Sequence, residues 1–234
     1  MKVHFIANGA SIRQLRGCER TYMRFTKQEI MFLTSVSRGN KPLGITLCMP
    51  KQGEKEDYIR ETLLSLTRKG LVSEEGILTK EGAGILKLWE MYRNSEKHVA
   101  VDDTYMALIP EGRLLMAAPV LEEYEVRFVM PEVFMHGILK AGNYLRLGEE
   151  KIVRGKWQEF DEAEWMEKTE DIEGSIHIRE FTKGKQTSDS IYFWTKEKGY
   201  LVNVSRKRIR ELSSGIMRRQ IYASLGGRKN GRSE

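Results

Sequence analysis

The centre of the 234-residue chain contains four adjacent runs, Val99-Ala-Val-Asp-Asp-Thr-Tyr-Met-Ala-Leu-Ile109, Pro110-Glu-Gly-Arg113, Leu114-Leu-Met-Ala-Ala118 and Tyr124-Glu-Val-Arg-Phe-Val-Met130. In the last run, apolar and charged residues alternate with the period of a strand that buries one face. The second run supplies a Pro and a Gly, which suit a tight turn because Pro fixes φ and Gly accepts positive φ. These patterns predict an antiparallel meander over residues 99–130.

Helices are predicted on the N-terminal side of the meander, within residues 26–94, because a sheet of this kind needs a covering layer in water. Thr26-Lys-Gln-Glu29 has the pattern of a capping box and predicts the start of the first helix. A second helix is predicted over residues 54–69, where apolar residues recur at helical spacing (Ile59, Leu63 and Leu66). Thr79 is expected to cap a third helix.

The C-terminal part repeats this scheme, with strands predicted over residues 175–204 and a basic helix over residues 205–223. We therefore predict an α+β fold in which a central antiparallel sheet is flanked by helices. A single domain over residues 1–234 is expected, built from two similar halves over 1–145 and 146–234.

The net charge of +6 is concentrated at one end of the sequence. Residues 205–234 hold nine Lys and Arg against two Glu, so residues 1–204 carry a net charge of −1. No apolar run reaches the ~18 residues that a membrane helix needs, and no signal peptide is recognised, so a cytoplasmic protein without membrane insertion is expected.

Motifs for catalysis or for metal binding are not found. The four His residues are scattered, and the two Cys residues, Cys18 and Cys48, have no metal-ligand spacing. The pair Asp102-Asp103 would point to opposite faces of a strand and could not share one site. The sequence therefore favours a binding protein without a cofactor over an enzyme.

The basic segment offers three cations for an acidic partner, Arg206, Arg210 and Arg218, on a helix whose other side is apolar. The alternative is that these three cations only form the solvated side of a helix whose apolar side packs on the core.

DNA binding by a winged-helix regulator is the alternative function. The order of helix, helix, short hairpin and helix in residues 26–94 is typical of winged-helix modules. However, the helix that would enter the groove carries four acidic residues in its first two turns (Glu54, Glu56, Asp57 and Glu61), which phosphates would repel. Nucleic acid is therefore not the expected partner.

Two segments resemble the EspG family, the cytosolic chaperones of type VII (ESX) secretion. The first runs through Phe25-Thr-Lys-Gln-Glu-Ile30, Pro42 and Ile59-Arg-Glu-Thr-Leu-Leu-Ser-Leu-Thr-Arg-Lys-Gly-Leu-Val72, and the second is Ile191-Tyr-Phe-Trp-Thr-Lys-Glu-Lys-Gly-Tyr-Leu-Val-Asn-Val204. The Lys- and Glu-rich composition indicates a member from a Gram-positive (Firmicutes-type) bacterium.

The resemblance implies a pseudo-twofold α+β chaperone, monomeric or homodimeric, that binds a secreted helical-hairpin protein. That client would be a WXG- or LXG-type substrate or its small partner. The contacts expected from the resemblance and the patterns are apolar residues of the central strands together with the basic residues named above (Met106, Leu108, Tyr124, Val126, Phe128, Arg206, Arg210 and Arg218).

Overall fold

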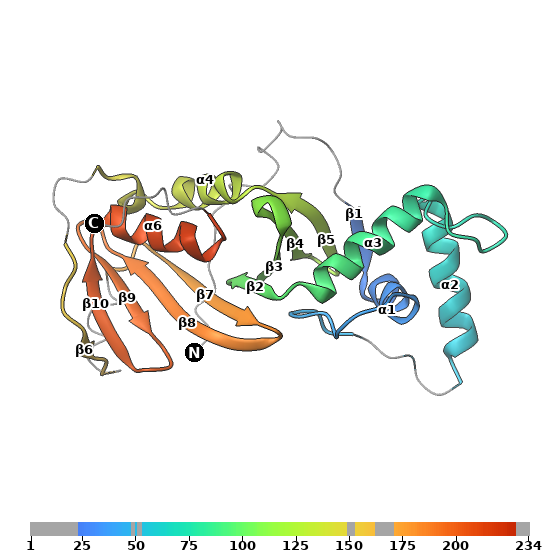
Figure 1. The fold of residues 1–234 in the computed structure, drawn as a ribbon, viewed down its shortest axis with the longest axis horizontal. Coiled ribbons are helices and arrows are strands. Elements are labelled where there is room, and N and C mark those ends of the chain that lie inside the picture. Colours follow the sequence, from blue (N-terminus) through green and yellow to red (C-terminus); the bar gives the residue numbers. More distant parts are fainter. Residues whose placement is uncertain (1–22, 48–49, 51–52, 149–152, 162–170, 228–234) are drawn as a thin grey trace.

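A computed structural model describes residues 23–47, 50, 53–148, 153–161 and 171–227 (Figure 1). Its strands are β1 (Met23–Thr26), β2 (Lys97–Val101), β3 (Thr104–Ile109), β4 (Arg113–Val120), β5 (Glu123–Val129), β6 (Gln158–Glu159), β7 (Gly174–Thr182), β8 (Lys185–Trp194), β9 (Gly199–Asn203) and β10 (Arg208–Leu212). Its α-helices are α1 (Lys27–Val36), α2 (Lys55–Arg68), α3 (Lys80–Asn94), α4 (Pro131–Ala141) and α6 (Ser214–Ser224).

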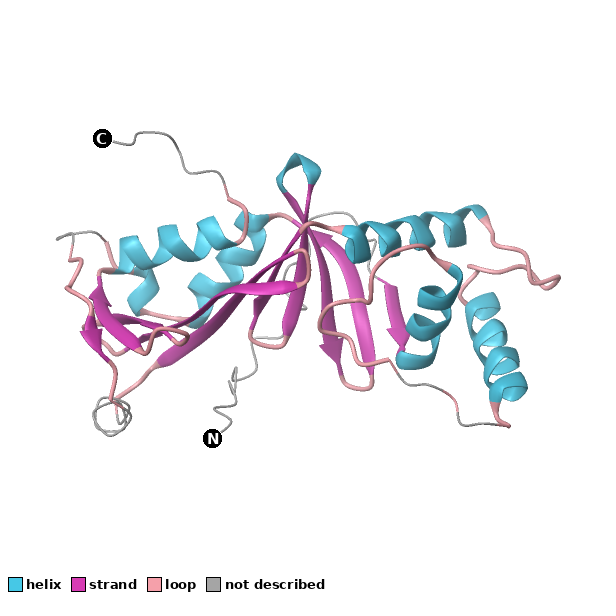
Figure 2. Ribbon diagram, turned by 60° about the horizontal axis from the view of Figure 1, so that its bottom comes forward, coloured by secondary structure: helices cyan, strands magenta, loops and turns pink. Residues whose placement is uncertain are grey.

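The strands form one sheet in the order β1-β5-β4-β3-β2-β7-β8-β9-β10-β6, with antiparallel pairing between all neighbours. The predicted α+β class with a large antiparallel sheet is therefore confirmed. The meander corresponds to β2–β5, and the predicted strands over 175–204 correspond to β7–β9. Helices α1–α3 gather at one end of the molecule, and α4 and α6 lie over the other part of the sheet (Figures 1 and 2).

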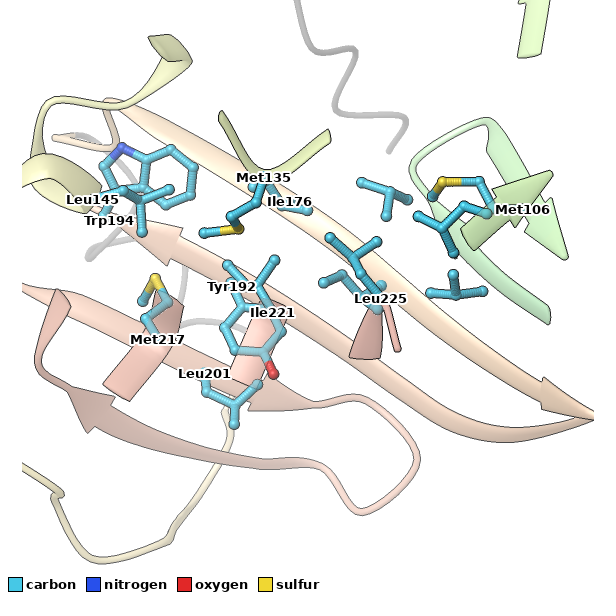
Figure 3. Packing of buried hydrophobic residues seen from close by; sticks show 14 of the residues in the cluster. Met106, Met135, Leu145, Ile176, Tyr192, Trp194, Leu201, Met217, Ile221 and Leu225 are labelled. Atoms are coloured by element: carbon cyan, nitrogen blue, oxygen red, sulfur yellow. The ribbon is translucent and has the colours of Figure 1, made fainter. Parts of the chain in front are cut away.

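The two faces of the sheet carry different cores. One face packs with α4 and α6 in a cluster that runs from the meander to β10 and includes Met106, Trp194, Met217 and Leu225 (Figure 3). The opposite face of the meander packs under α1–α3. Since both faces of β3–β5 are covered, β4 is buried along most of its length, and the residues of β3 and β5 are buried or half-buried.

The predicted helix signals are present in the N-terminal part. Thr26 caps α1, and its amide donates to Glu29 Oε2 at 2.7 Å while its hydroxyl accepts from the Glu29 amide, which completes the capping box. Thr79 caps α3 by accepting from the Gly82 amide at 3.0 Å. Gly70, after α2, has the positive φ of 71° expected of a helix-ending glycine.

The prediction of a basic helix over residues 205–223 is wrong for the first half of that range. Residues 208–212 form strand β10, and the helix α6 begins only at Ser214. The apolar residues Ile209 and Leu212 are three apart, which places them on one side of a helix but on opposite faces of a strand. Both faces are covered here, since Ile209 and Leu212 belong to different core clusters, so the same spacing suits a strand.

Glu29 is expected to stabilise the whole helical end of the molecule, because its side chain is 1% exposed and binds three groups. It accepts from the Thr26 amide, from Ser65 Oγ at 2.9 Å and from Lys69 Nζ at 2.6 Å. Glu29→Ala should lower the free energy of unfolding by about 2 kcal/mol, because it removes the acceptor of the part-buried Thr26 amide and Ser65 hydroxyl and the charge partner of Lys69. Urea unfolding measures this, and Glu61→Ala, on the exposed side of α2, should stay within about 0.5 kcal/mol of the parent.

His98 on β2 should make folding sensitive to acid. Its ring is 5% exposed, Nε2 lies 2.8 Å from the Tyr92 carbonyl oxygen, and burial lowers the pKa from 6.5. Below pH 6.5 the unfolded chain therefore binds a proton that the folded chain still excludes, so stability should fall as pH falls from 6.5 toward the folded pKa. Thermal melting between about pH 7 and 5 measures this slope. A His98→Gln variant with the same slope as the parent would contradict the assignment to His98.

Candidate binding surface

The five apolar residues predicted as contacts lie on opposite faces of the sheet. Tyr124, Val126 and Phe128 face α1–α3, whereas Met106 and Leu108 face the α4 and α6 side. Met106 is 0% exposed, and Tyr124 and Val126 are each 9% exposed, so these three are core residues. Leu108 and Phe128 are half-buried. The structure therefore does not bring the five together into one surface.

Phe128 borders a small apolar cavity of about 110 Å³ between α1, α3 and β5. Its other lining residues are Phe25, Ile30, Leu33, Ile85, Leu88, Trp89, Val126 and Arg127. The Arg113 guanidinium lies 5.0 Å from the centre of the Phe128 ring and covers it. A space of this size has room for a few water molecules or one small side chain, not for a helix.

The three predicted cations do not share a helix face. Arg206 is exposed in the turn between β9 and β10. Arg210 lies on β10, with its guanidinium 4.3 Å from the centre of the Trp157 ring, and burial together with the nearby Arg154 lowers its pKa. Arg218 on α6 donates to the carbonyl oxygens of Leu145 and Leu147 at 2.7 and 2.8 Å. Arg218 thus has a structural role, and Arg206 remains open to a partner.

A larger apolar depression lies between α2 and the hairpin formed by residues 71–78. We call it the α2 groove; its volume is about 410 Å³. It is lined by Glu56, Ile59, Arg60, Leu63, Leu64, Thr67, Val72, Ser73, Glu74 and Gly76.

Large apolar side chains are exposed in and beside the α2 groove. Ile59 is 45% exposed and Leu64 53% exposed on α2, and Ile77 on the hairpin is 67% exposed. The helical spacing of Ile59, Leu63 and Leu66 suggested one core-facing side, but only Leu66 is buried, together with Thr62. Thr62 can occupy a buried position one turn before Leu66 because its hydroxyl donates to the Tyr58 carbonyl oxygen at 2.7 Å.

Both walls of the α2 groove are held in place by hydrogen bonds. In the hairpin, the Ser73 amide donates to the Ile77 carbonyl at 2.7 Å and the Thr79 amide to the Leu71 carbonyl at 3.1 Å. Helix α2 is fixed to α1 because the Tyr58 hydroxyl donates to the Gln28 carbonyl at 2.9 Å. The exposed apolar residues therefore sit on a prepared surface rather than on a loose loop.

The charges at the α2 groove are mainly acidic. Glu56 and Glu74 belong to its lining. The lining cation Arg60 is paired with Asp57, at 2.7 Å between Nη2 and Oδ1. Next to Glu74, a hydrogen bond from Ser73 lowers the pKa of the Glu75 carboxyl. The groove is thus apolar at its floor and negative at its edges.

A polar cluster lies where the two halves of the sheet meet. His177 Nε2 is 2.6 Å from Asp189 Oδ1, the His177 amide donates to Asp102 Oδ1 at 3.0 Å, and Arg179 donates to the Asp102 carbonyl at 2.7 Å. Burial raises the pKa of Asp102. Asp102 and Asp103 occupy the turn after β2 rather than a strand, and Asp102 has φ of 52°. The contacts of Asp102 join the turn after β2 to β7, and the contact of His177 with Asp189 joins β7 to β8, so the cluster has a structural role.

In the part of the chain that the structure describes, no three His, Cys, Asp or Glu residues are grouped as they would be around a metal ion. Among these same residues, no helix is long and apolar enough to span a membrane. Cys18 and Cys48 lie outside the described residues.

One solved structure with a similar fold is the Mycobacterium tuberculosis type VII secretion system chaperone EspG5 in complex with the PE25-PPE41 dimer. The similarity covers 91% of this chain and 99% of that chain with a TM-score of 0.50 and 8% sequence identity. At this identity the likeness establishes the fold, and it agrees with the EspG-like α+β architecture expected from the sequence.

Comparison with curated proteins gives no match. The sequence matches a family described as "Domain of unknown function (DUF5081)" over residues 19–229. Since this match spans most of the 234 residues, the chain belongs to the DUF5081 family.

Proposed function

We propose that this protein is a chaperone of type VII secretion, which binds a helical client and keeps it soluble before export. The observation that carries this proposal is the fold shared with EspG5 along nearly the full length of both chains. EspG5 was solved in complex with the PE25-PPE41 dimer, so the same architecture is known to bind another protein.

The surface of the protein supports a binding role. The α2 groove exposes Ile59 and Leu64, and Ile77 is exposed on the hairpin beside it. Clustered exposed apolar side chains of this kind favour a site of protein interaction. An apolar client region would aggregate in water, and a chaperone can cover and release it without a chemical reaction. On this proposal the protein acts in the cytoplasm by binding alone, without catalysis or a cofactor.

The client that fits this role is a secreted helical-hairpin protein, of the WXG or LXG type, or the small partner of such a protein. We place the chaperone in a Gram-positive bacterium on the basis of its Lys- and Glu-rich composition. Five of the contacts predicted from sequence keep accessible surface and stay proposed contacts: Arg206 is exposed, and Leu108, Phe128, Arg210 and Arg218 are half-buried.

The acidic character of α2 supports a protein client over DNA. In the winged-helix alternative α2 would lie against phosphates, yet Glu56 and Glu74 line its groove and Asp57 is paired with the one Arg of that lining. Phosphate binding requires Lys and Arg that release counterions, and this surface would repel the backbone.

The proposal predicts that affinity-tagged protein expressed in its native host retains a small secreted helical protein. Mass spectrometry of the purified complex under nuclease treatment identifies the bound chain, and an unrelated tagged bait is the control. The purified chaperone should also suppress light scattering by that client in a one-to-one mixture. Recovery of a discrete DNA fragment without nuclease, and of no secreted protein with it, would refute the chaperone role.

Arg206 provides a residue-level test because its side chain is exposed and its change should not disturb the core. We expect Arg206→Glu to reduce the captured client by about five-fold, since a charge reversal at the edge of an interface weakens association. Lys185→Glu, exposed on β8, is the matched control and should retain the client. Equal capture by both variants would remove Arg206 from the interface.

A further inference from the structure

We propose that the α2 groove is a docking site for one amphipathic helix of a partner protein, with an apolar stripe flanked by Lys or Arg. The partner's identity follows from the proposed function, whereas the chemistry of its helix follows from the groove itself. Three features carry the proposal: the arrangement of apolar residues, the rigidity of the walls and the sign of the charges.

The apolar residues of the groove form a stripe that suits a helix. Ile59 and Leu63 are one turn apart on α2, and Thr67 continues the same side by another turn. Val72 closes the floor from the hairpin side. Helix α2 has 14 residues and is therefore about 21 Å long, which matches a partner helix of about four turns. A helix that enters such a groove uses apolar residues at i, i+4 and i+7.

Rigid walls lower the entropic cost of docking. The Gly76 amide donates to the Ser73 carbonyl at 3.0 Å and closes the hairpin tip, where Gly76 has a positive φ of 79°. At the hairpin base, Gly82 lies so close to Leu71 that a Cβ atom would stand 1.9 Å from the Leu71 carbonyl oxygen. The hairpin therefore packs directly on α3, and little ordering is left to do when a partner binds.

The charges select a basic partner. Glu56 stands on the α2 side of the groove and Glu74 on the hairpin side, so a docked helix would have a carboxylate along each flank. Arg60 does not offset them, because Asp57 already neutralises it. Lys or Arg on both sides of the partner's apolar stripe would complement this arrangement, and Glu or Asp there would be repelled.

The same charges argue against a second copy of this chain as the occupant. Two α2 grooves facing each other would bring Glu56 and Glu74 of one copy toward the same residues of the other, which is repulsive. Self-association through this surface is nevertheless a measurable outcome and enters the test.

The test uses the full chain and two fluorescent helical peptides of about 18 residues, roughly five turns, with an identical Leu stripe flanked by Lys in one and by Glu in the other. Fluorescence anisotropy should show that the Lys peptide binds at least about ten-fold more tightly than the Glu peptide. Amide hydrogen exchange should show new protection within residues 56–78. Equal affinities, or protection elsewhere in the chain, would overturn the proposal.

Variants at exposed positions locate the interaction. Leu64→Gln and Ile77→Gln together should weaken binding of the Lys peptide by about ten-fold, because they remove the apolar contact area. Leu147→Gln is the matched control, since Leu147 is 47% exposed and its carbonyl oxygen accepts from Arg218 of α6, at the other end of the molecule from α2 (Figure 1), and it should bind as the parent does.

A charge-reversal variant distinguishes the loss of a binding contact from a loss of folding. Glu56→Lys combined with Glu74→Lys should reverse the preference so that the Glu peptide binds more tightly, a gain that an unfolded protein cannot give. No reversal would overturn the charge assignment. Dimerisation of the parent protein, measured by light scattering and lost in the Leu64 and Ile77 variant, would overturn the proposal in favour of a second copy.

The outcomes separate this inference from the proposed function. If Leu64 and Ile77 variants still capture the native client, the chaperone role stands and the α2 groove is not the docking site. If the peptides bind as expected but no secreted client is recovered from the host, the groove is a docking site and the secretion role fails.

Discussion

The pairing of β2 with β7 is the constraint on which the rest of the molecule depends. Five residue pairs, from Lys97 with Thr182 to Val101 with Ile178, join two meanders that lie far apart in the sequence into a single sheet. The side chains of β2 are buried except at Lys97, so this junction lies inside the molecule. The polar contacts of Asp102 with β7 fix its register, since a slip of one residue would turn every side chain to the other face.

The junction lets a single helical layer serve both meanders. Helices α4 and α6 cover one face of the sheet and share one core with strands of both meanders. The N-terminal helices cover only the opposite face of the first meander, and α2 packs mainly on α1. Its outer side is therefore not required for the core, and Leu64 stays exposed there.

The local parts of the fold were predictable from sequence, and the parts that depend on distant contacts were not. The capping box at Thr26, the cap at Thr79 and the alternation in β5 act through neighbours within a few residues. The strand β10 was predicted as a helix because the spacing of Ile209 and Leu212 suits both structures, and only the presence of cores on both faces decides between them. The α2 groove was missed for a similar reason, since the helical spacing of Ile59, Leu63 and Leu66 does not tell which of them the neighbouring helices cover.

The position of α6 in the core has a consequence for the order of folding during synthesis. Met217, Ile221 and Leu225 complete the cluster that covers Met106 on the first meander, more than a hundred residues earlier in the chain. A ribosome would have to deliver residues 214–225 before that sheet face is shielded from water. We therefore expect the nascent first half to expose an apolar sheet face while the second half is translated, and the growing chain to be prone to aggregation until α6 docks.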